Sequence, residues 1–205
     1  DREQYTWKTG SSQLLRKRQL RWGSNLFHVG ILTILAGHFV GLLTPIAVFD
    51  GLGISHGFKQ GLAIGVGGLA GVICFIGIAL LAHRRLFDAR IRATSSFGDI
   101  AILLLIWLQL ILGLCTIFIS LGHLDGHEMV KFMNWAQGIA TLQPSAAAYV
   151  VDVHPLFKAH LFLGLSLLLL FPFTRLVHIW SAPIGYLVRP GYQIVRTRTR
   201  PVRNP

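Results

Sequence analysis

The sequence has few acidic residues and few cysteines. Only 8 of its 205 residues are Asp or Glu, against 19 Lys and Arg. Its two cysteines, Cys74 and Cys115, stand outside any C-x-x-C or C-x-x-C-H pattern, so covalent c-type haem attachment and a zinc ribbon are unsupported. The P-loop, GxSxG and HExxH motifs and a paired-carboxylate motif are missing as well. These absences exclude the enzyme classes that depend on such motifs.

Long apolar runs take the place of those motifs. Hydrophobic residues make up 53% of the chain and charged residues 13%, with a mean hydropathy of +0.58. A run of about 20 apolar residues is long enough to cross the hydrocarbon core of a bilayer. Lipid cannot satisfy backbone polar groups, so such runs must be helical. The sequence therefore predicts an all-α integral membrane protein, an antiparallel four-helix transmembrane bundle with spans at 24–49, 60–82, 97–122 and 155–181.

The segments between these spans are short, with one exception. The loop 123–154 contains a mixed apolar and polar stretch from Glu128 to Ile139, which predicts a short helix lying in the membrane interface. A basic segment, 1–23, precedes the first span. A basic tail, 182–205, follows the last and is expected to lie against lipid headgroups, a partner or solvent.

The basic residues predict how the chain is oriented. All but three of the 19 Lys and Arg residues lie in segment 1–23, in the 83–96 loop, or from Arg175 onwards. The exceptions are Lys59, Lys131 and Lys158. By the positive-inside rule, both termini and the 83–96 loop are cytoplasmic, and the 123–154 loop lies outside. Because the charge flanks apolar runs, it favours a lipid surface and argues against a nucleic-acid partner.

Four histidines lie within or near two of the spans. His28 and His38 are on the first span, and His160 and His178 are on the fourth. Ionisable groups at membrane depth are costly and usually face a partner inside the bundle. Antiparallel spans bring His28 level with His178, and His38 level with His160. A continuous fourth helix separates its two histidines by five turns, about 27 Å, against about 15 Å on the first, so the helices or rings must tilt.

Two opposed neutral imidazoles are a ligand set suited to haem iron, whereas zinc normally requires more ligands. The pattern predicts two non-covalent, bis-histidine haem b groups between the first and last helices. Gly30, Gly37, Gly41 and Gly164 flank the histidines. These glycines allow a porphyrin to approach or, equally, allow close helix packing. Arg175 precedes His178 by three residues, where it is suited to a haem propionate or a lipid phosphate.

Three stretches resemble a known family. They are "NLFHVGILTILAGHFVGLLTP", "RRLFDARIRATSS" and "HLFLGLSLLLLFPFTRLVHIWSAP". They are similar to the gamma subunit of respiratory nitrate reductase, a membrane cytochrome b of the bacterial inner membrane, and the similarity covers nearly the whole chain. It implies that His38 and His160 ligate an outer haem where quinol is oxidised, and that His28 and His178 ligate an inner haem. Electrons would then pass to an iron–sulfur beta subunit and a molybdenum-containing alpha subunit, which reduces nitrate.

The resemblance also implies a quinol pocket. "FKQGLAIGVGG" matches the region that carries a lysine near the quinol, so Lys59 is the candidate; interfacial snorkelling is the alternative interpretation. Gly37 would lie beside the outer haem, and no residue carries over as catalytic. The family pattern has five spans, of which the first is absent here, so we expect a trimmed N-terminus.

Two other functions remain open on the sequence. One is a membrane anchor whose haems are structural, and the other is a related di-haem cytochrome b of a different reductase. The leading hypothesis is a quinol-oxidising subunit that passes electrons through two haems to a cytoplasmic reductase.

Overall fold

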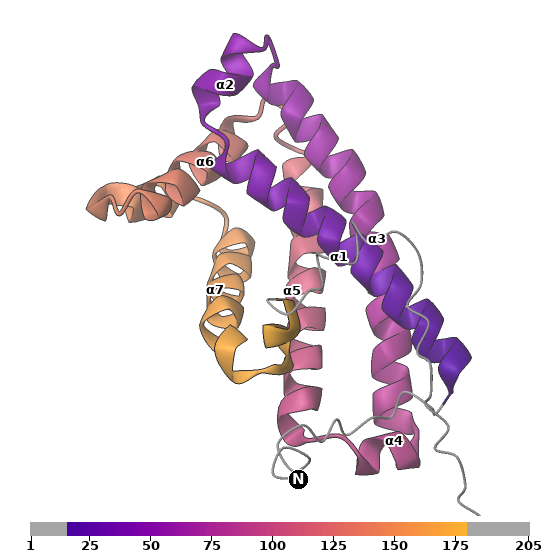
Figure 1. Cartoon of the computed structure of the whole chain (residues 1–205). Coiled ribbons are helices and arrows are strands. Elements are labelled where there is room, and N and C mark those ends of the chain that lie inside the picture. Colours follow the sequence, from indigo (N-terminus) through magenta and orange to yellow (C-terminus); the bar gives the residue numbers. More distant parts are fainter. Residues whose placement is uncertain (1–15, 180–205) are drawn as a thin grey trace, which may run out of the picture.

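The computed structural model describes residues 16–179, and four long helices dominate it (Figure 1). They are α1 (Lys17–Leu43), α3 (His56–Phe87), α5 (Phe97–Ser120) and α7 (Pro155–Leu170). Shorter elements connect them: α2 (Ile46–Gly51), α4 (Ala89–Ala93), α6 (His127–Ala140) and the 3₁₀ helices η3 (Pro144–Val150), η4 (Phe171–Phe173) and η5 (Arg175–Ile179). Within 16–179 no strand occurs, and four helices are long and apolar enough to cross a membrane. The all-α class predicted from the sequence is confirmed.

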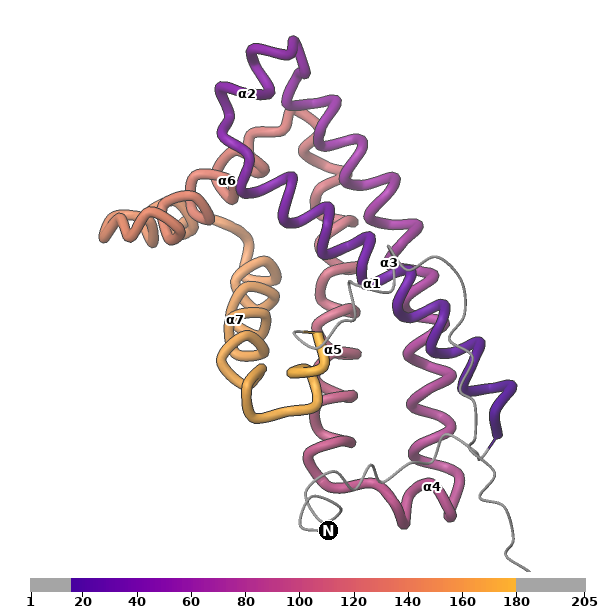
Figure 2. The backbone as a smooth tube through the Cα atoms, viewed as in Figure 1, coloured from indigo at the N-terminus to yellow at the C-terminus, as the bar shows by residue number. Residues whose placement is uncertain are grey.

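The long helices pack in series, and α3 is the most enclosed of them. α1 packs along α3, α3 packs against α5, and α5 packs against α7 (Figure 2). In the most apolar window of α3, 28% of residues are buried, against 0% for α7. Cys74 and Ile78 of α3 and Leu110 of α5 form the small core, with Phe27 of α1 packed against it. Most other apolar side chains face outwards, as they would toward lipid.

Glycine lets α1 approach α3 closely. A Cβ on Gly30 would lie 2.6 Å from both the Cβ and the backbone nitrogen of Cys74. A backbone neighbour cannot rotate away, so this position requires the missing side chain. Gly67 on α3, by contrast, has nothing within 4 Å of its Cβ position.

The first predicted span, 24–49, is two helices in the structure. α1 begins earlier, at Lys17, and ends at Leu43, because Pro45 lacks the N–H that would continue the helix. Thr44, before the proline, is extended (φ −69°, ψ 126°). Gln137 of α6 donates from Nε2 to the carbonyl oxygens of Leu42 and Thr44, both at 3.0 Å, and so satisfies groups that the helix end leaves free.

The fourth predicted span, 155–181, also ends early. α7 stops at Leu170 because Pro172 removes a helical donor and its ring clashes with the preceding turn. The chain then turns through η4 and an extended Thr174 (φ −125°, ψ 175°) into η5, which lies back beside α5 in Figure 1. Residues 180 and 181 lie outside the described part of the chain, as do 1–15 and the tail 182–205.

The remaining helices begin at capping residues. Ser55 accepts a hydrogen bond from Phe58 N at the start of α3, which runs beyond the predicted 60–82 at both ends. Ser96 and Asp99 form a reciprocal capping box at the start of α5, close to the predicted 97–122 span. Asp88 caps α4, and hydrogen bonds from Ile91 N and Arg90 N hold the pKa of its carboxyl below the ordinary range.

The two ends of the bundle differ. α2 and α6 lie at one end and α4 at the other, and we call these the α6 end and the α4 end (Figure 1). α6 lies within the loop expected to hold a short helix. Gly126 precedes its first residue, and the φ of +79° at this position favours glycine. Together with η3, α6 projects sideways from the long helices (Figure 1).

We expect Gly30→Ala to destabilise the α1–α3 contact by about 1–3 kcal/mol, the usual cost of overpacking. Gly67→Ala is the matched control and should be neutral or slightly stabilising, since alanine favours helix more than glycine does. The measurement is the unfolding midpoint of each variant purified in detergent, followed by circular dichroism. Equal midpoints for the two variants would contradict the packing described above.

Candidate functional site

The structure brings the four membrane histidines together in two pairs. The ring centroids of His38 and His160 are 6.3 Å apart, with 42° between the ring planes. Those of His28 and His178 are 6.4 Å apart, with 70° between the planes. These are the partners that the antiparallel arrangement predicts. Each pair joins α1 to the segment formed by α7, η4 and η5.

The early end of α7 removes the mismatch in spacing. The sequence predicted one continuous helix carrying both His160 and His178. That prediction is wrong, because α7 stops ten residues after His160. Ten helical residues rise about 15 Å, the same as the ten residues from His28 to His38. The turn at η4 then returns the chain toward His28, so His178 need not lie about 27 Å from His160. The expected tilt is also present: the ring planes of the pairs are inclined by 42° and 70°, and α1 runs obliquely to α7 (Figure 1).

The ring separations fit two imidazoles that share one metal ion. A metal–imidazole bond is about 2 Å long and half a ring adds about 1 Å, so opposed ligands place their centroids about 6 Å apart. Residues 16–179 contain no group of three or more His, Cys, Asp or Glu suited to one ion. A two-imidazole donor set fits haem iron, whose remaining ligands come from the porphyrin, better than it fits zinc.

Three of the four rings are oriented by main-chain carbonyls. Nδ1 of His28 lies 2.7 Å from Ser24 O, and Nδ1 of His38 lies 2.8 Å from Ile34 O. Nδ1 of His178 lies 2.5 Å from Arg175 O. When Nδ1 donates to a carbonyl, the lone pair is left on Nε2, which is the usual arrangement of a metal-bound histidine.

His160 has a different neighbour, Gln109 of α5. Gln109 Nε2 donates to His160 O at 3.1 Å and lies 3.4 Å from His160 Nε2. Among the described residues, Gln109 Oε1 and His160 Nδ1 are buried without a hydrogen-bond partner. Sequence reasoning did not place Gln109 beside a predicted ligand.

The space beside the rings is open on the α1 side. His28 and His38 are exposed, and α1 makes no extensive contact with α7 in the described part of the chain. Nothing lies within 4 Å of the Cβ positions of Gly37 and Gly41, so both leave room beside His38. Gly30 instead serves helix packing, and Gly164 faces Gln109. Close helix packing thus accounts for Gly30 but not for Gly37 or Gly41, where the approach of a porphyrin stays a prediction.

Lys59, predicted to bind quinol, is buried near the α6 end. Its residue is only 7% exposed, which contradicts the snorkelling alternative. The ammonium lies 2.9 Å from Met133 Sδ and 3.5 Å from the centroid of the Phe49 ring. Among residues 16–179 it has no oxygen acceptor within hydrogen-bonding distance. An ammonium whose described hydrogen-bond partner is a single sulfur still has protons to donate to a ligand oxygen.

Arg175, predicted to bind a haem propionate or a lipid phosphate, contacts a protein carboxylate in the structure. Its Nε is in direct contact with Oδ1 of Asp99, which is 5% exposed. Arg85 Nη1 lies 3.7 Å from the other oxygen of the same carboxylate. On the sequence alone, Asp99 is a polar residue of the third predicted span for which helix contacts are favoured over chemistry. Its position after Ser96 signals a capping box, but nothing in the sequence pairs it with Arg175.

Known proteins are similar to this chain over nearly its whole length. The family model "Nitrate reductase gamma subunit" matches residues 1–198. The respiratory nitrate reductase 1 gamma chain of Escherichia coli (strain K12) is 48% identical over 198 residues, covering 97% of this chain and 87% of that protein. The nitrate reductase gamma chain of Bacillus subtilis (strain 168) is 39% identical, covering 96% and 87%.

A third relative is larger. The nitrate reductase-like protein NarX of Mycobacterium tuberculosis (strain ATCC 25618 / H37Rv) is 34% identical over 208 residues, covering 98% of this chain and 32% of that protein. The family model and the E. coli and B. subtilis relatives agree with the resemblance stated from the sequence. The chain belongs to the nitrate reductase gamma subunit family.

Proposed function

We propose that this gamma subunit oxidises quinol for its nitrate reductase complex and carries two non-covalent bis-histidine haem b groups. His38 and His160 would hold one, and His28 and His178 the other. The main support is the pair of ring separations, 6.3 and 6.4 Å, which suit two imidazoles sharing one iron. A haem b bound in this way supplies one-electron oxidation and reduction at its iron.

The two pairs lie at different depths along α1. Ten residues separate His28 from His38, a rise of about 15 Å. The carbonyl bonds to His28, His38 and His178 keep Nε2 of each ring free to ligate. A one-electron site at each of two depths is what a chain requires to move charge across part of a bilayer.

The surroundings of Lys59 support a quinol site at the α6 end. Its ammonium would donate to a quinol oxygen and so orient the ring, because its described hydrogen bond goes to the Met133 sulfur and its ring contact is with Phe49, which leaves donors free. Gly37 precedes His38 and leaves open space there, which suits a flat ligand near that histidine pair. Lys59 and Gly37 are proposed as binding residues, with no catalytic acid or base assigned.

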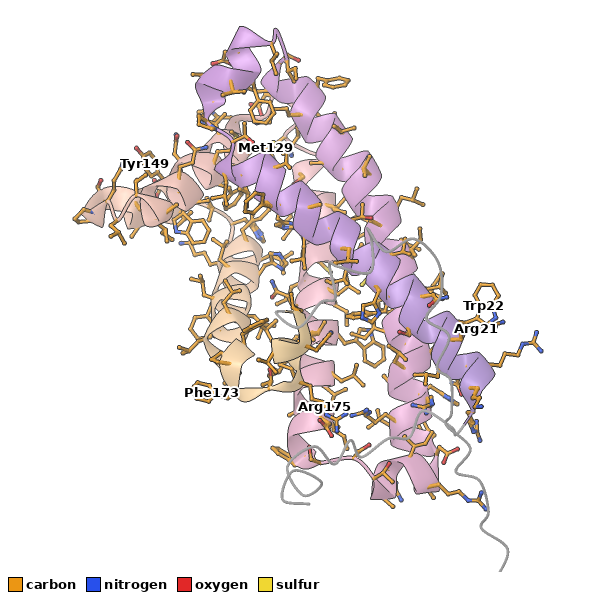
Figure 3. All side chains as sticks on the ribbon, in the orientation of Figure 1. Arg21, Trp22, Met129, Tyr149, Phe173 and Arg175 are labelled. Atoms are coloured by element: carbon orange, nitrogen blue, oxygen red, sulfur yellow. The ribbon has the colours of Figure 1, made fainter. Side chains whose placement is uncertain are left out.

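The charge distribution supports an orientation. The α4 end carries the arginines around residues 84–92, so the positive-inside rule favours that end, and both termini, in the cytoplasm of a bacterial inner membrane. Trp22 is 53% exposed and points away from the bundle, as an interfacial tryptophan would (Figure 3). Quinol protons would leave at the α6 end, and lipid would surround the helices.

The gamma chain works in a complex with other nitrate reductase subunits. We propose that these are an iron–sulfur beta subunit, which accepts electrons near the His28–His178 pair, and a molybdenum-containing alpha subunit, which reduces nitrate. An anchor with structural haems, and a cytochrome b for another reductase, are the competing functions. Quinol-dependent haem reduction excludes the first, and copurification with the molybdenum subunit excludes the second.

We expect His38→Ala to lose one haem and keep the other, because it removes a ligand from only one pair. His28→Ala should lose the other haem. The measurement is haem content per chain, together with reduced-minus-oxidised optical spectra. His83→Ala is the control, since His83 is an exposed α3 residue outside both pairs. If His38→Ala retains two haems per chain, the assignment of His38 as a ligand is wrong.

We expect Lys59→Met to lower kcat/KM for quinol about 10- to 100-fold, as expected when a charged hydrogen bond worth roughly 1.5–3 kcal/mol is lost. Both haems should remain, because Lys59 lies outside the histidine pairs. Lys158→Met is the matched control: Lys158 is exposed and donates to Val151 O at 2.5 Å. If both variants oxidise quinol like the unaltered protein, Lys59 does not bind it.

A further inference from the structure

His178 occupies an unusual position for a membrane ligand. The other three histidines of the two pairs lie on α1 or α7, whereas His178 lies in η5, a 3₁₀ turn beyond the end of α7. The hydrogen bonds of Thr174, Val177 and His178 are local to residues 171–179. A single short turn fixes few backbone groups, so its placement depends on contacts with the rest of the bundle.

The contact that ties η5 to the bundle is an ion pair. Arg175, the first residue of η5, contacts the Asp99 carboxylate at the start of α5 (Figure 3 shows Arg175 beside that part of α5). The carbonyl oxygen of the same arginine accepts the Nδ1–H of His178 at 2.5 Å. One residue therefore links the carboxylate through its side chain and the imidazole through its main chain.

Asp99 is itself held firmly. Its side chain accepts from Ser96 N at 3.1 Å, and its own N–H donates to Ser96 Oγ at 3.2 Å. Arg85, in the last turn of α3, provides a second positive charge 3.7 Å away. A carboxylate that is 5% exposed is stable only when it is paired in this way. The position of Asp99 is thus fixed by α3 and α5, and it can serve as a fixed point for η5.

We propose that Asp99 is the positioning residue of the His28–His178 site. It holds Arg175, which holds η5 at the depth where His178 faces His28. This inference rests on the proposed function, because it assigns a role at one of the two haem sites. It also gives Arg175 a protein partner in place of a propionate or a lipid phosphate.

The test uses the whole nitrate reductase complex with Asp99→Asn. Asparagine keeps the shape and an oxygen acceptor for Ser96 N, while the negative charge and the acceptor facing Arg175 are lost. We expect haem content to fall from two toward one per chain, with the loss confined to the haem that His28→Ala also removes. The haem that remains should still be reduced by quinol, and any residual His28–His178 haem should show an altered electron paramagnetic resonance signal.

Two further variants separate positioning from folding. Asp99→Glu retains the charge and is a usual third residue of a capping box, so it should restore most of the second haem. Asp88→Asn is the control, because Asp88 also pairs with an arginine, Arg16 at 2.7 Å, and also caps a helix, but is not in contact with η5. It should keep both haems.

The outcomes distinguish the two hypotheses. If Asp99→Asn keeps both haems with unaltered spectra, or loses both together, the positioning role is wrong while the histidine assignment stands. If the unaltered complex contains no haem that depends on His28, the proposed function itself fails. Arg175→Gln cannot separate positioning from direct haem binding, because an arginine that bound a haem propionate would give the same loss of haem. Asp99 is negatively charged and does not bind a propionate, so Asp99→Asn tests positioning alone.

Discussion

The site depends on pairs of imidazole rings. In each pair, one ring comes from α1 and the other from the segment formed by α7, η4 and η5. Histidine is costly at membrane depth unless it has a partner. Within the two pairs the ring centroids lie 6.3 and 6.4 Å apart, and main-chain carbonyls pair with the Nδ1 atoms of His28, His38 and His178. α1 and α7 are not otherwise packed closely together, so the rings mark where the two elements meet. The rest of the bundle, with α3 and α5 in the middle, keeps these two elements at that separation.

Two prolines end helices at positions that matter for the proposed sites. Pro45 ends α1 above His38, so that α2 can bring Phe49 over the Lys59 ammonium. Pro172 ends α7 after ten residues from His160 and returns the chain toward α5. Both breaks lie near the ends of the apolar region, where backbone groups can find other partners; Gln137 supplies one such partner at the end of α1. Regular helices alone would have left one histidine of each helix without a level partner.

The charged groups near the two ends behave differently. At the α4 end, Asp99 gathers Arg85 and Arg175, so opposite charges satisfy one another. At the α6 end, Lys59 has sulfur and aromatic neighbours and no oxygen partner among the described residues. The first arrangement is complete within the chain and suits a structural role. The second still lacks an acceptor, and this suits the binding of a ligand from outside.

The sequence by itself determined the class of protein, the number of long apolar helices, the four histidines and how they pair. It could do so because helical hydropathy and antiparallel order require no knowledge of side-chain contacts. It also pointed to Lys59, but not to its burial. Only the tertiary structure decided that η5 returns toward α5, that Gln109 lies beside His160, and that Asp99 binds Arg175. Each of these depends on contacts between segments that are far apart in the sequence, and hydropathy along the chain carries no information about such contacts.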